Sequence, residues 1–183
     1  HDYSGHGQSG GRLEDGSISL WLRQSLAVFQ AQTQGRQILI GSSMGGWIAL
    51  RMAQELLKAG SRQLAGLVLI APAPDFTMDL IEDKLTDTQR QALLEKGYVE
   101  GSSDSLPEPN RWAQAFLDDG RKNRVMGGVI ETHCPVHIIQ GMLDTDVPYE
   151  HALKLAAHFP KDSITVSLVP DGDHRLSRPQ DLD

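Results

Sequence analysis

A serine flanked by glycines is the first candidate for chemistry in this sequence. The segment 41–45 reads GSSMG and matches the pattern GxSxG, with Ser43 at its centre. The segment 37–41 (QILIG) before it is short, apolar and β-branched, which favours a strand buried on both faces, and residues 48–57 after it have the apolar spacing of a helix. A nucleophile elbow needs this order of buried strand, sharp turn and helix. We therefore interpret Ser43 as a nucleophile, with an ordinary Gly-Ser loop as the alternative.

The backbone next to this serine could stabilise negative charge. The turn would hold the Ser43 hydroxyl above the carboxyl end of the strand, at the amino terminus of the following helix, where negative charge is favoured. The backbone N–H of Met44, at the start of that helix, could then donate to the oxyanion of a tetrahedral intermediate. This placement predicts Met44 as one donor of an oxyanion hole.

A serine hydroxyl is a poor nucleophile near neutral pH and needs a base within hydrogen-bond reach. His174 lies in the polar segment PDGDHRLSRP, a few residues after the strand-like segment 164–169. Ligand-binding loops of parallel sheets gather at the carboxyl ends of the strands. His174 is therefore the candidate general base, although a surface histidine in a polar loop is the simpler interpretation of this residue taken alone.

An acid that orients the histidine is expected at a third strand end. Asp144 lies four residues after Gln140, in QGMLDTDVP, and Asp146 is a rival two residues further on. Either carboxylate could instead only complement the dipole of the next helix. We favour Asp144, because the chain order Ser, Asp, His is the order found in hydrolases built on a strand–elbow–helix unit.

The elements that would position these residues alternate along the chain. Ser17 is a plausible cap for a first helix, and Pro148 is an acceptable first residue of the last predicted one. Short apolar segments between the helices predict strands at 37–41, 66–71, 136–140 and 164–169. Strands that alternate with helices indicate a mostly parallel α/β sheet with flanking helices.

The alternation stops between Ala73 and His133. Two polar stretches with helical character, Met78 to Lys96 and Arg111 to Val125, are separated by SSDSLPEPN. We predict one domain over residues 1–183 with an insertion at about 75–132 that forms a small helical lid and shapes ligand access.

Composition excludes several classes of partner. A chain of 183 residues with 39% hydrophobic residues can bury one core, and a formal charge of −7 argues against nucleic acid and anionic lipid. The apolar stretches are far shorter than the roughly 20 residues that a membrane span needs. Cys134 is the single cysteine, which excludes an internal disulfide and suits a reducing, cytoplasmic compartment.

A metal or cofactor is not expected. His133, Cys134 and His137 are close in sequence, but Pro135 disfavours a helix there. In a strand the two histidines would be roughly 13 Å apart, too far to share one ion. Trp47 and Trp112 suit packing or a pocket wall.

Several stretches together resemble a known family: DYSGHGQS, GSSMGGW, APAPDF, QGMLDTDVPYEHAL and DGDHRLSRPQDL. They are similar to the α/β-hydrolase superfamily, and in particular to the abhydrolase subfamily that includes the mitochondrial palmitoyl-protein thioesterase, also described as an acyl-glucuronide esterase, and its bacterial relatives. The resemblance implies Ser43, Asp144 and His174 as catalytic residues and Met44 as one oxyanion donor. It also implies a small helical lid and acyl esters or thioesters as substrates.

The two ends of the chain depart from this family. The segment that resembles HDYSGHG follows the fourth strand in the family, so the first three strands and the second oxyanion donor would precede His1. The helix expected after the histidine loop would follow Asp183. We therefore expect a part of a longer protein, with weak or no activity as an isolated polypeptide, and a mitochondrial location if the source is eukaryotic.

The predicted function is a serine hydrolase that cleaves small-molecule acyl esters or thioesters through an acyl-enzyme. A non-catalytic small-molecule binding module on the same fold and a serine peptidase are the alternatives. Oligomeric state is not fixed by these residues.

Overall fold

The computed structural model describes residues 1–101, 110–160 and 163–182. The chain divides into two compact units, described here one at a time: His1–Phe29 with Asp75–Arg124, and Gln30–Pro74 with Val125–Asp183. The prediction of a single domain with a lid at about 75–132 stays a prediction. All residues of the candidate site belong to the second unit.

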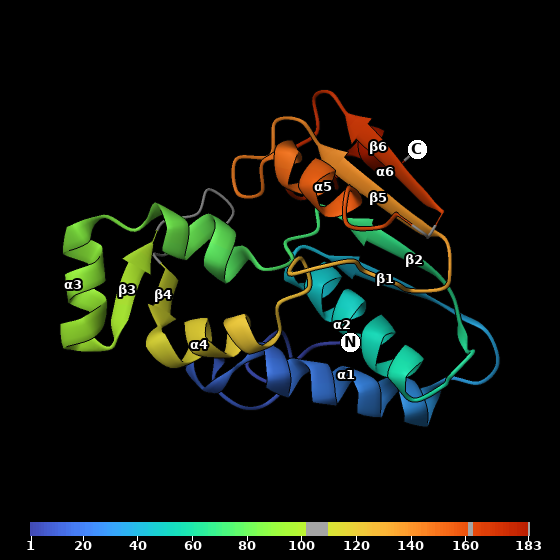
Figure 1. Ribbon diagram of the computed structural model, residues 1–183, viewed down its shortest axis with the longest axis horizontal. Helices are drawn as coiled ribbons and strands as arrows, with labels where there is room; N and C mark the ends of the chain where they lie inside the picture. The colour runs from blue at the N-terminus through green and yellow to red at the C-terminus, as the bar shows by residue number, and fades with distance from the viewer. Residues whose placement is uncertain (102–109, 161–162, 183) are drawn as a thin grey trace. The chain divides into compact units, whose positions relative to one another are not determined.

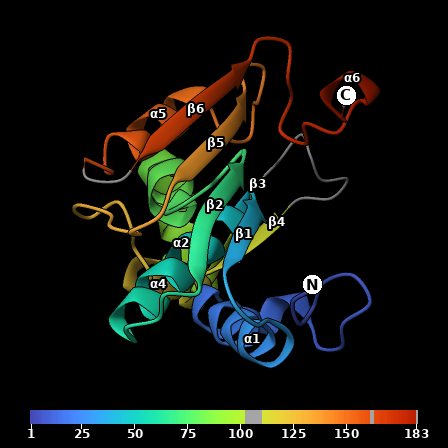
Figure 2. The same cartoon turned by 90° about the vertical axis from the view of Figure 1, so that its right-hand side faces the viewer.

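The second unit is built on a four-stranded sheet. Its strands, in spatial order, are β1 (Gln37–Ser42), β2 (Leu64–Ile70), β5 (Val136–Gly141) and β6 (Ile164–Val169). Every neighbouring pair is parallel, and the carboxyl ends are in register, with Ser42 opposite Ile70 and Gly141 opposite Val169. Figures 1 and 2 show the four strands side by side. The loops after β1, β5 and β6 therefore meet at one edge, and the predicted parallel α/β sheet is confirmed.

Two helices of this unit, α2 (Met44–Lys58) and α5 (Tyr149–Ala156), pack on the same face of the sheet (Figure 2). The inner face of α2 is apolar, and Trp47 and Leu50 have no exposed surface. Trp47 is therefore a core residue, one of the two roles expected for it. Pro148 directly precedes α5 as its N-cap, one position earlier than predicted. A four-residue helix, α6 (Pro179–Leu182), ends the described chain.

The expectation that β1 is buried on both faces is wrong. Ile38 and Ile40 are 62% and 70% exposed, whereas Leu39 between them is partly buried. Alternate side chains of a strand point to opposite faces, and among the described residues β1 is an edge strand that α2 covers on one face. An apolar, β-branched run does not by itself report how many of its faces are covered.

The first unit carries most of α1 (Ile18–Gln32), which follows the short helix η1 (Leu13–Asp15) and the predicted N-terminal loop. The Leu20 N–H donates to the Ser17 hydroxyl over 3.1 Å, as expected for a helix cap. Aromatic rings fill the same unit, and the rings of Trp112 and Phe116 stack with centroids 5.7 Å apart. Trp112 is thus a packing residue.

Of the two helical stretches predicted between Ala73 and His133, the first is divided into several short helices in the structure, and the second is shortened to a single helix. The first stretch contains η2 (Thr77–Ile81), η3 (Glu82–Lys84) and α3 (Asp87–Lys96), and the second contains the end of β4 (Asn110–Ala113) and α4 (Gln114–Lys122). The strand β3 (Tyr98–Gly101) pairs with β4 in an antiparallel hairpin. The segment SSDSLPEPN lies outside the described residues except for its last residue.

Local chemistry explains why α3 is a separate helix. Thr86 and Gln89 form a reciprocal capping box at its start, which fixes the helix boundary there. Gly97 ends it with a left-handed backbone, φ 76°. Helical periodicity could not reveal that a new helix begins after Thr86, because the sequence before and after this residue is polar.

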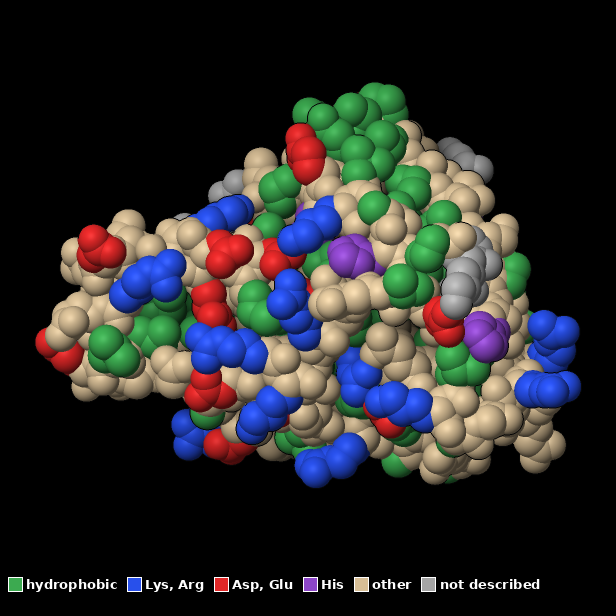
Figure 3. All heavy atoms as spheres, in the orientation of Figure 1, with side chains coloured by type: hydrophobic (Ala, Val, Ile, Leu, Met, Phe, Trp, Pro, Cys, Tyr) green, Lys and Arg blue, Asp and Glu red, His purple; other side chains and the backbone are tan. Residues whose placement is uncertain are grey.

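The visible surface carries intermixed acidic and basic side chains (Figure 3). Of the helices in the described part of the chain, none has the length and apolar character needed to span a bilayer.

Candidate active site

Ser43 lies at the sharp turn between β1 and α2. Its backbone has φ 52° and ψ −122°, a conformation that is strained for a residue with a side chain. The turn is held because the Ser43 N–H donates to the Ile70 carbonyl over 2.9 Å and the Ser43 carbonyl accepts from the Ala73 N–H over 3.1 Å. A Cβ on Gly41 would clash with the backbone of Gly45, so a glycine is required before the turn. The predicted order of strand, sharp turn and helix is present.

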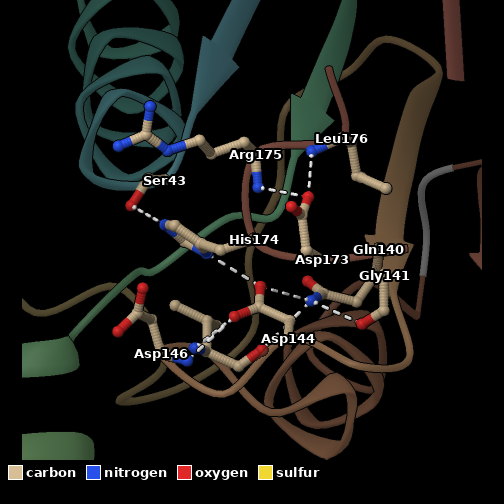
Figure 4. Close-up of polar contacts among 10 residues, drawn as sticks. Ser43, Gln140, Gly141, Asp144, Asp146, Asp173, His174, Arg175 and Leu176 are labelled. Atoms are coloured by element: carbon tan, nitrogen blue, oxygen red, sulfur yellow. Dashed lines mark hydrogen bonds and ion pairs between the residues drawn. The ribbon is translucent and has the colours of Figure 1, made fainter. Parts of the chain in front are cut away.

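His174 lies in the loop after β6 and reaches the predicted nucleophile Ser43 and the predicted acid Asp144 (Figure 4). Its Nε2 is 3.0 Å from the Ser43 hydroxyl oxygen, and its Nδ1 is 2.8 Å from Oδ2 of Asp144. With the proton on Nδ1, the ring donates to the carboxylate and its Nε2 accepts from the serine hydroxyl. Residues separated by 131 and 30 positions in the sequence thus form one continuous hydrogen-bonded chain.

The loop that carries His174 is held by the side chain of Asp173 and by the loop after β5. Oδ1 of Asp173 accepts from the backbone N–H of Arg175 and of Leu176, over 3.0 and 2.9 Å. The Leu143 N–H donates to the Gly172 carbonyl over 2.9 Å. A Cβ on Gly141 would clash with the backbone carbonyl of Gly172, so the close approach of these two loops needs a glycine there.

Asp144 has a fully buried side chain, and hydrogen bonds occupy both of its carboxylate oxygens. Oδ1 accepts from the backbone N–H groups of Asp146 and Val147, over 3.0 and 2.8 Å. Oδ2 accepts from His174 and from the side-chain amide of Gln140. Of the two aspartates left open by the sequence, the structure therefore places Asp144 against the imidazole.

The surroundings of His174 change its proton affinity. Burial of the ring lowers its pKa, but the hydrogen bond and negative charge of Asp144, with the charges of Asp146 and Asp173, outweigh that effect. The net result is a pKa raised above that of an ordinary histidine. The ring can therefore accept a proton readily from a neighbouring hydroxyl.

Within the described residues, one group of three side chains offers atoms that are close enough together to bind a metal ion. The ligand atoms of Asp144, Asp146 and His174 all lie within 4.8 Å of one another. A cation bound there would compete with the hydrogen bond between His174 and Asp144. In the part of the chain that the structure describes, His133 and Cys134 join no such group; His137 Nε2 instead lies 2.8 Å from the Ser167 hydroxyl.

Gln140 is a site residue that sequence reasoning assigned only to a strand. Its side chain has no exposed surface, and its amide nitrogen lies 2.9 Å from Oδ2 of Asp144. The available signal was a long polar side chain at the end of a mostly apolar strand-like segment, because such a residue is rarely fully buried without a polar partner.

Comparison with known proteins identifies the family. The sequence profile of the alpha/beta hydrolase family matches residues 1–182. The chain belongs to the alpha/beta hydrolase family. Within this family it is 28% identical to the mouse protein named palmitoyl-protein thioesterase ABHD10, mitochondrial, over 99% of this chain and 60% of that protein. The human protein of that name is 25% identical, over 99% of this chain and 58% of its own length. The chain thus spans about 60% of the length of the curated relatives that it matches.

Solved structures of alpha/beta hydrolase relatives have the same fold. A hydrolase from Agrobacterium vitis S4, known from a crystal structure, is 60% identical to this chain in sequence. Its structure matches with a TM-score of 0.93, over 100% of this chain and 70% of that one. Mouse alpha/beta hydrolase domain-containing protein 10 is 28% identical with a TM-score of 0.88, over 99% of this chain and 71% of that one. The resemblance and the fold predicted from the sequence are both confirmed.

Proposed function

We propose that this protein is a serine hydrolase that cleaves acyl esters or thioesters through an acyl-enzyme, with Ser43, His174 and Asp144 as its triad. The observation that carries the proposal is the hydrogen-bonded chain from the Ser43 hydroxyl through His174 to Asp144, with distances of 3.0 and 2.8 Å. Membership of a hydrolase family supports the same reaction type.

The reaction would run in two halves. His174 Nε2 takes the hydroxyl proton as Ser43 Oγ attacks the acyl carbon, and Asp144 stabilises the imidazolium that forms. The imidazolium then protonates the departing alcohol or thiol, which leaves the acyl group on Ser43. A water molecule attacks this acyl-serine with His174 again as base, releasing the carboxylic acid and the free serine.

The oxyanion of each tetrahedral intermediate needs hydrogen-bond donors. Met44 is the first residue of α2, so its N–H belongs to the helix start, where N–H groups have no partner within the helix. We assign it as one donor, and the partial positive charge of the α2 amino terminus supports the assignment.

The names of the family relatives support the proposed substrate class. The ABHD10 proteins are named palmitoyl-protein thioesterases, which suggests acyl thioesters and the related esters for this protein as well. A lid formed by residues about 75–132 that shapes ligand access belongs to the same proposal; most of this segment lies in the first compact unit. A cytoplasmic location, or a mitochondrial one in a eukaryotic source, stays a prediction.

A fluorophosphonate probe tests the nucleophile in the full-length protein. We expect labelling of the wild type and of Ser42→Ala, a control at the adjacent serine, and no labelling of Ser43→Ala. Labelling of Ser43→Ala at the normal rate would remove the assignment. Tight ligand binding without a burst of product from an activated ester would instead indicate a binding module.

A comparison of substrates distinguishes an esterase or thioesterase from a peptidase. Turnover should be measured on acyl esters of increasing chain length, on a thioester and on a peptide, all at equal concentration. We expect turnover of the esters and the thioester; turnover of the peptide alone would indicate a serine peptidase.

A further inference from the structure

Gln140 is buried in β5 and contacts the proposed acid directly. Its Nε2 donates to Oδ2 of Asp144 over 2.9 Å, the same oxygen that accepts from His174 Nδ1 (Figure 4). The same nitrogen lies 3.0 Å from the Val147 carbonyl and 3.2 Å from the Gly141 carbonyl. All three neighbours of the amide nitrogen are therefore acceptors.

This environment fixes the orientation of the amide. Oε1 of Gln140 is buried and accepts no hydrogen bond from any residue that the structure describes. Rotating the amide by half a turn would bring Oε1 against a carboxylate and two carbonyl oxygens, which repel it. The NH2 group must therefore face Asp144, although the other end of the amide stays unpaired.

An unpaired buried acceptor is unfavourable for folding. An apolar side chain of similar length, such as methionine, would fill the same space without burying an unpaired oxygen. What glutamine supplies at this position, and methionine does not, is an N–H donor to the carboxylate.

We propose that Gln140 is a positioning residue that acts through Asp144, an inference that rests on the proposed function. Two backbone N–H groups hold Oδ1 of Asp144, and Gln140 holds Oδ2, so the carboxylate cannot turn away from His174. The ring is then kept with Nδ1 toward the acid and Nε2 toward Ser43. The hydrogen bonds of the Gln140 side chain go to Asp144, Val147 and Gly141, and none of them goes to Ser43 or His174.

Two variants of the full-length protein test this role against simple space filling. Gln140→Met keeps the length and removes the donor, and we expect kcat to fall roughly tenfold, the effect of one charge-assisted hydrogen bond, with KM within about twofold. Ile138→Val changes another fully buried side chain of β5 and should leave kcat unchanged. Both values are expressed per site titrated with the fluorophosphonate probe.

Gln140→Glu supplies a readout that a structural role would not give. The new carboxyl would face only acceptors, so it would hold its proton to a higher pH than an ordinary glutamate and, while protonated, would donate as the amide does. When it ionises, two negative charges face each other. We expect kcat of this variant to fall again as the pH rises, whereas the wild type stays level there.

The outcomes separate this inference from the proposed function. If the wild type neither reacts with the probe nor turns over esters, the proposed function is wrong. If the wild type is active but Gln140→Met retains its kcat and Gln140→Glu retains the wild-type pH profile, only the positioning role is wrong. Should Gln140→Met fail to fold, the pH profile of Gln140→Glu decides alone.

Discussion

At the scale of single residues, Asp144 and Asp146 illustrate how strongly position determines role. Both are acidic and only two residues apart, but Asp144 receives the hydrogen bond from His174, while Asp146 donates its backbone N–H to Asp144. A carboxylate that accepts from the ring sets the tautomer of the imidazole. A carboxylate that is only nearby changes the proton affinity of the ring.

Asparagine substitution should separate these two roles. We expect Asp144→Asn to lower kcat on the order of 10³-fold or more, because an amide that donates to Nδ1 favours the wrong tautomer. Asp146→Asn should leave kcat at the optimal pH within about threefold, since it removes only a nearby charge. Steady-state kinetics on an activated ester measure both, and equal losses in the two variants would contradict the assignment of Asp144.

The pH dependence of the reaction follows from the raised pKa of His174. The proposed general base would work when neutral, so kcat/KM should fall as the pH drops through this pKa, with its midpoint above the value of about 6.5 for an unperturbed histidine. Asp146→Asn removes one charge that favours the imidazolium and should move the midpoint to lower pH. A midpoint that moves upward in this variant would show that Asp146 does not act through its charge.

At the scale of elements, the site depends on close contact between the loops after β5 and β6. Gly141 makes this contact possible, because a Cβ there would clash with the Gly172 carbonyl that accepts from the Leu143 N–H. The acid and the base of the proposed triad lie in these two loops. Backbone packing between them therefore sets the distance between His174 and Asp144.

A methyl group at this contact should lower both activity and stability. We expect Gly141→Ala to lower the free energy of unfolding by roughly 1–3 kcal/mol, the usual effect of overpacking, and to lower kcat at least tenfold as the loops separate. Gly128→Ala is the matched control in the same unit, because a Cβ there would meet no atom within 4 Å. Denaturant unfolding and kinetics on both variants provide the measurement; a Gly141→Ala variant with wild-type kcat would show that the contact is dispensable.

At the scale of the whole molecule, burial is uneven. The central strands β2 and β5 contain fully or almost fully buried residues such as Leu67, Leu69, Val136 and Ile138. The β3–β4 hairpin belongs to the other compact unit and is mostly half-exposed. Local opening is easiest where few apolar side chains are buried.

Amide hydrogen exchange should reflect this difference. We expect the amides of β2 and β5 to exchange most slowly and those of the β3–β4 hairpin to exchange considerably faster. Mass spectrometry of peptides covering residues 64–70, 98–101 and 136–141 measures the contrast. Equal protection of the hairpin and the central strands would mean that the two units open together.

The sequence alone determined the parts of this protein that are local. The order of strand, small-residue turn and helix around Ser43 can be predicted because apolar period, glycine spacing and capping chemistry act over a few residues. The strands β2, β5 and β6 were predictable for the same reason, and parallel strands place their following loops at one edge. The hairpin β3–β4 was missed, because its short, polar strands have no such period.

Tertiary structure decided everything that depends on which side chain meets which across the fold. It places Asp144 rather than Asp146 against His174 and turns Gln140 toward that carboxylate, and in the described part of the chain it leaves Ile38 and Ile40 of β1 exposed. These contacts join segments that are distant in the chain, so their geometry depends on the register and packing of the assembled sheet. Residue type and spacing can identify such groups as candidates, but only the folded backbone fixes their distances.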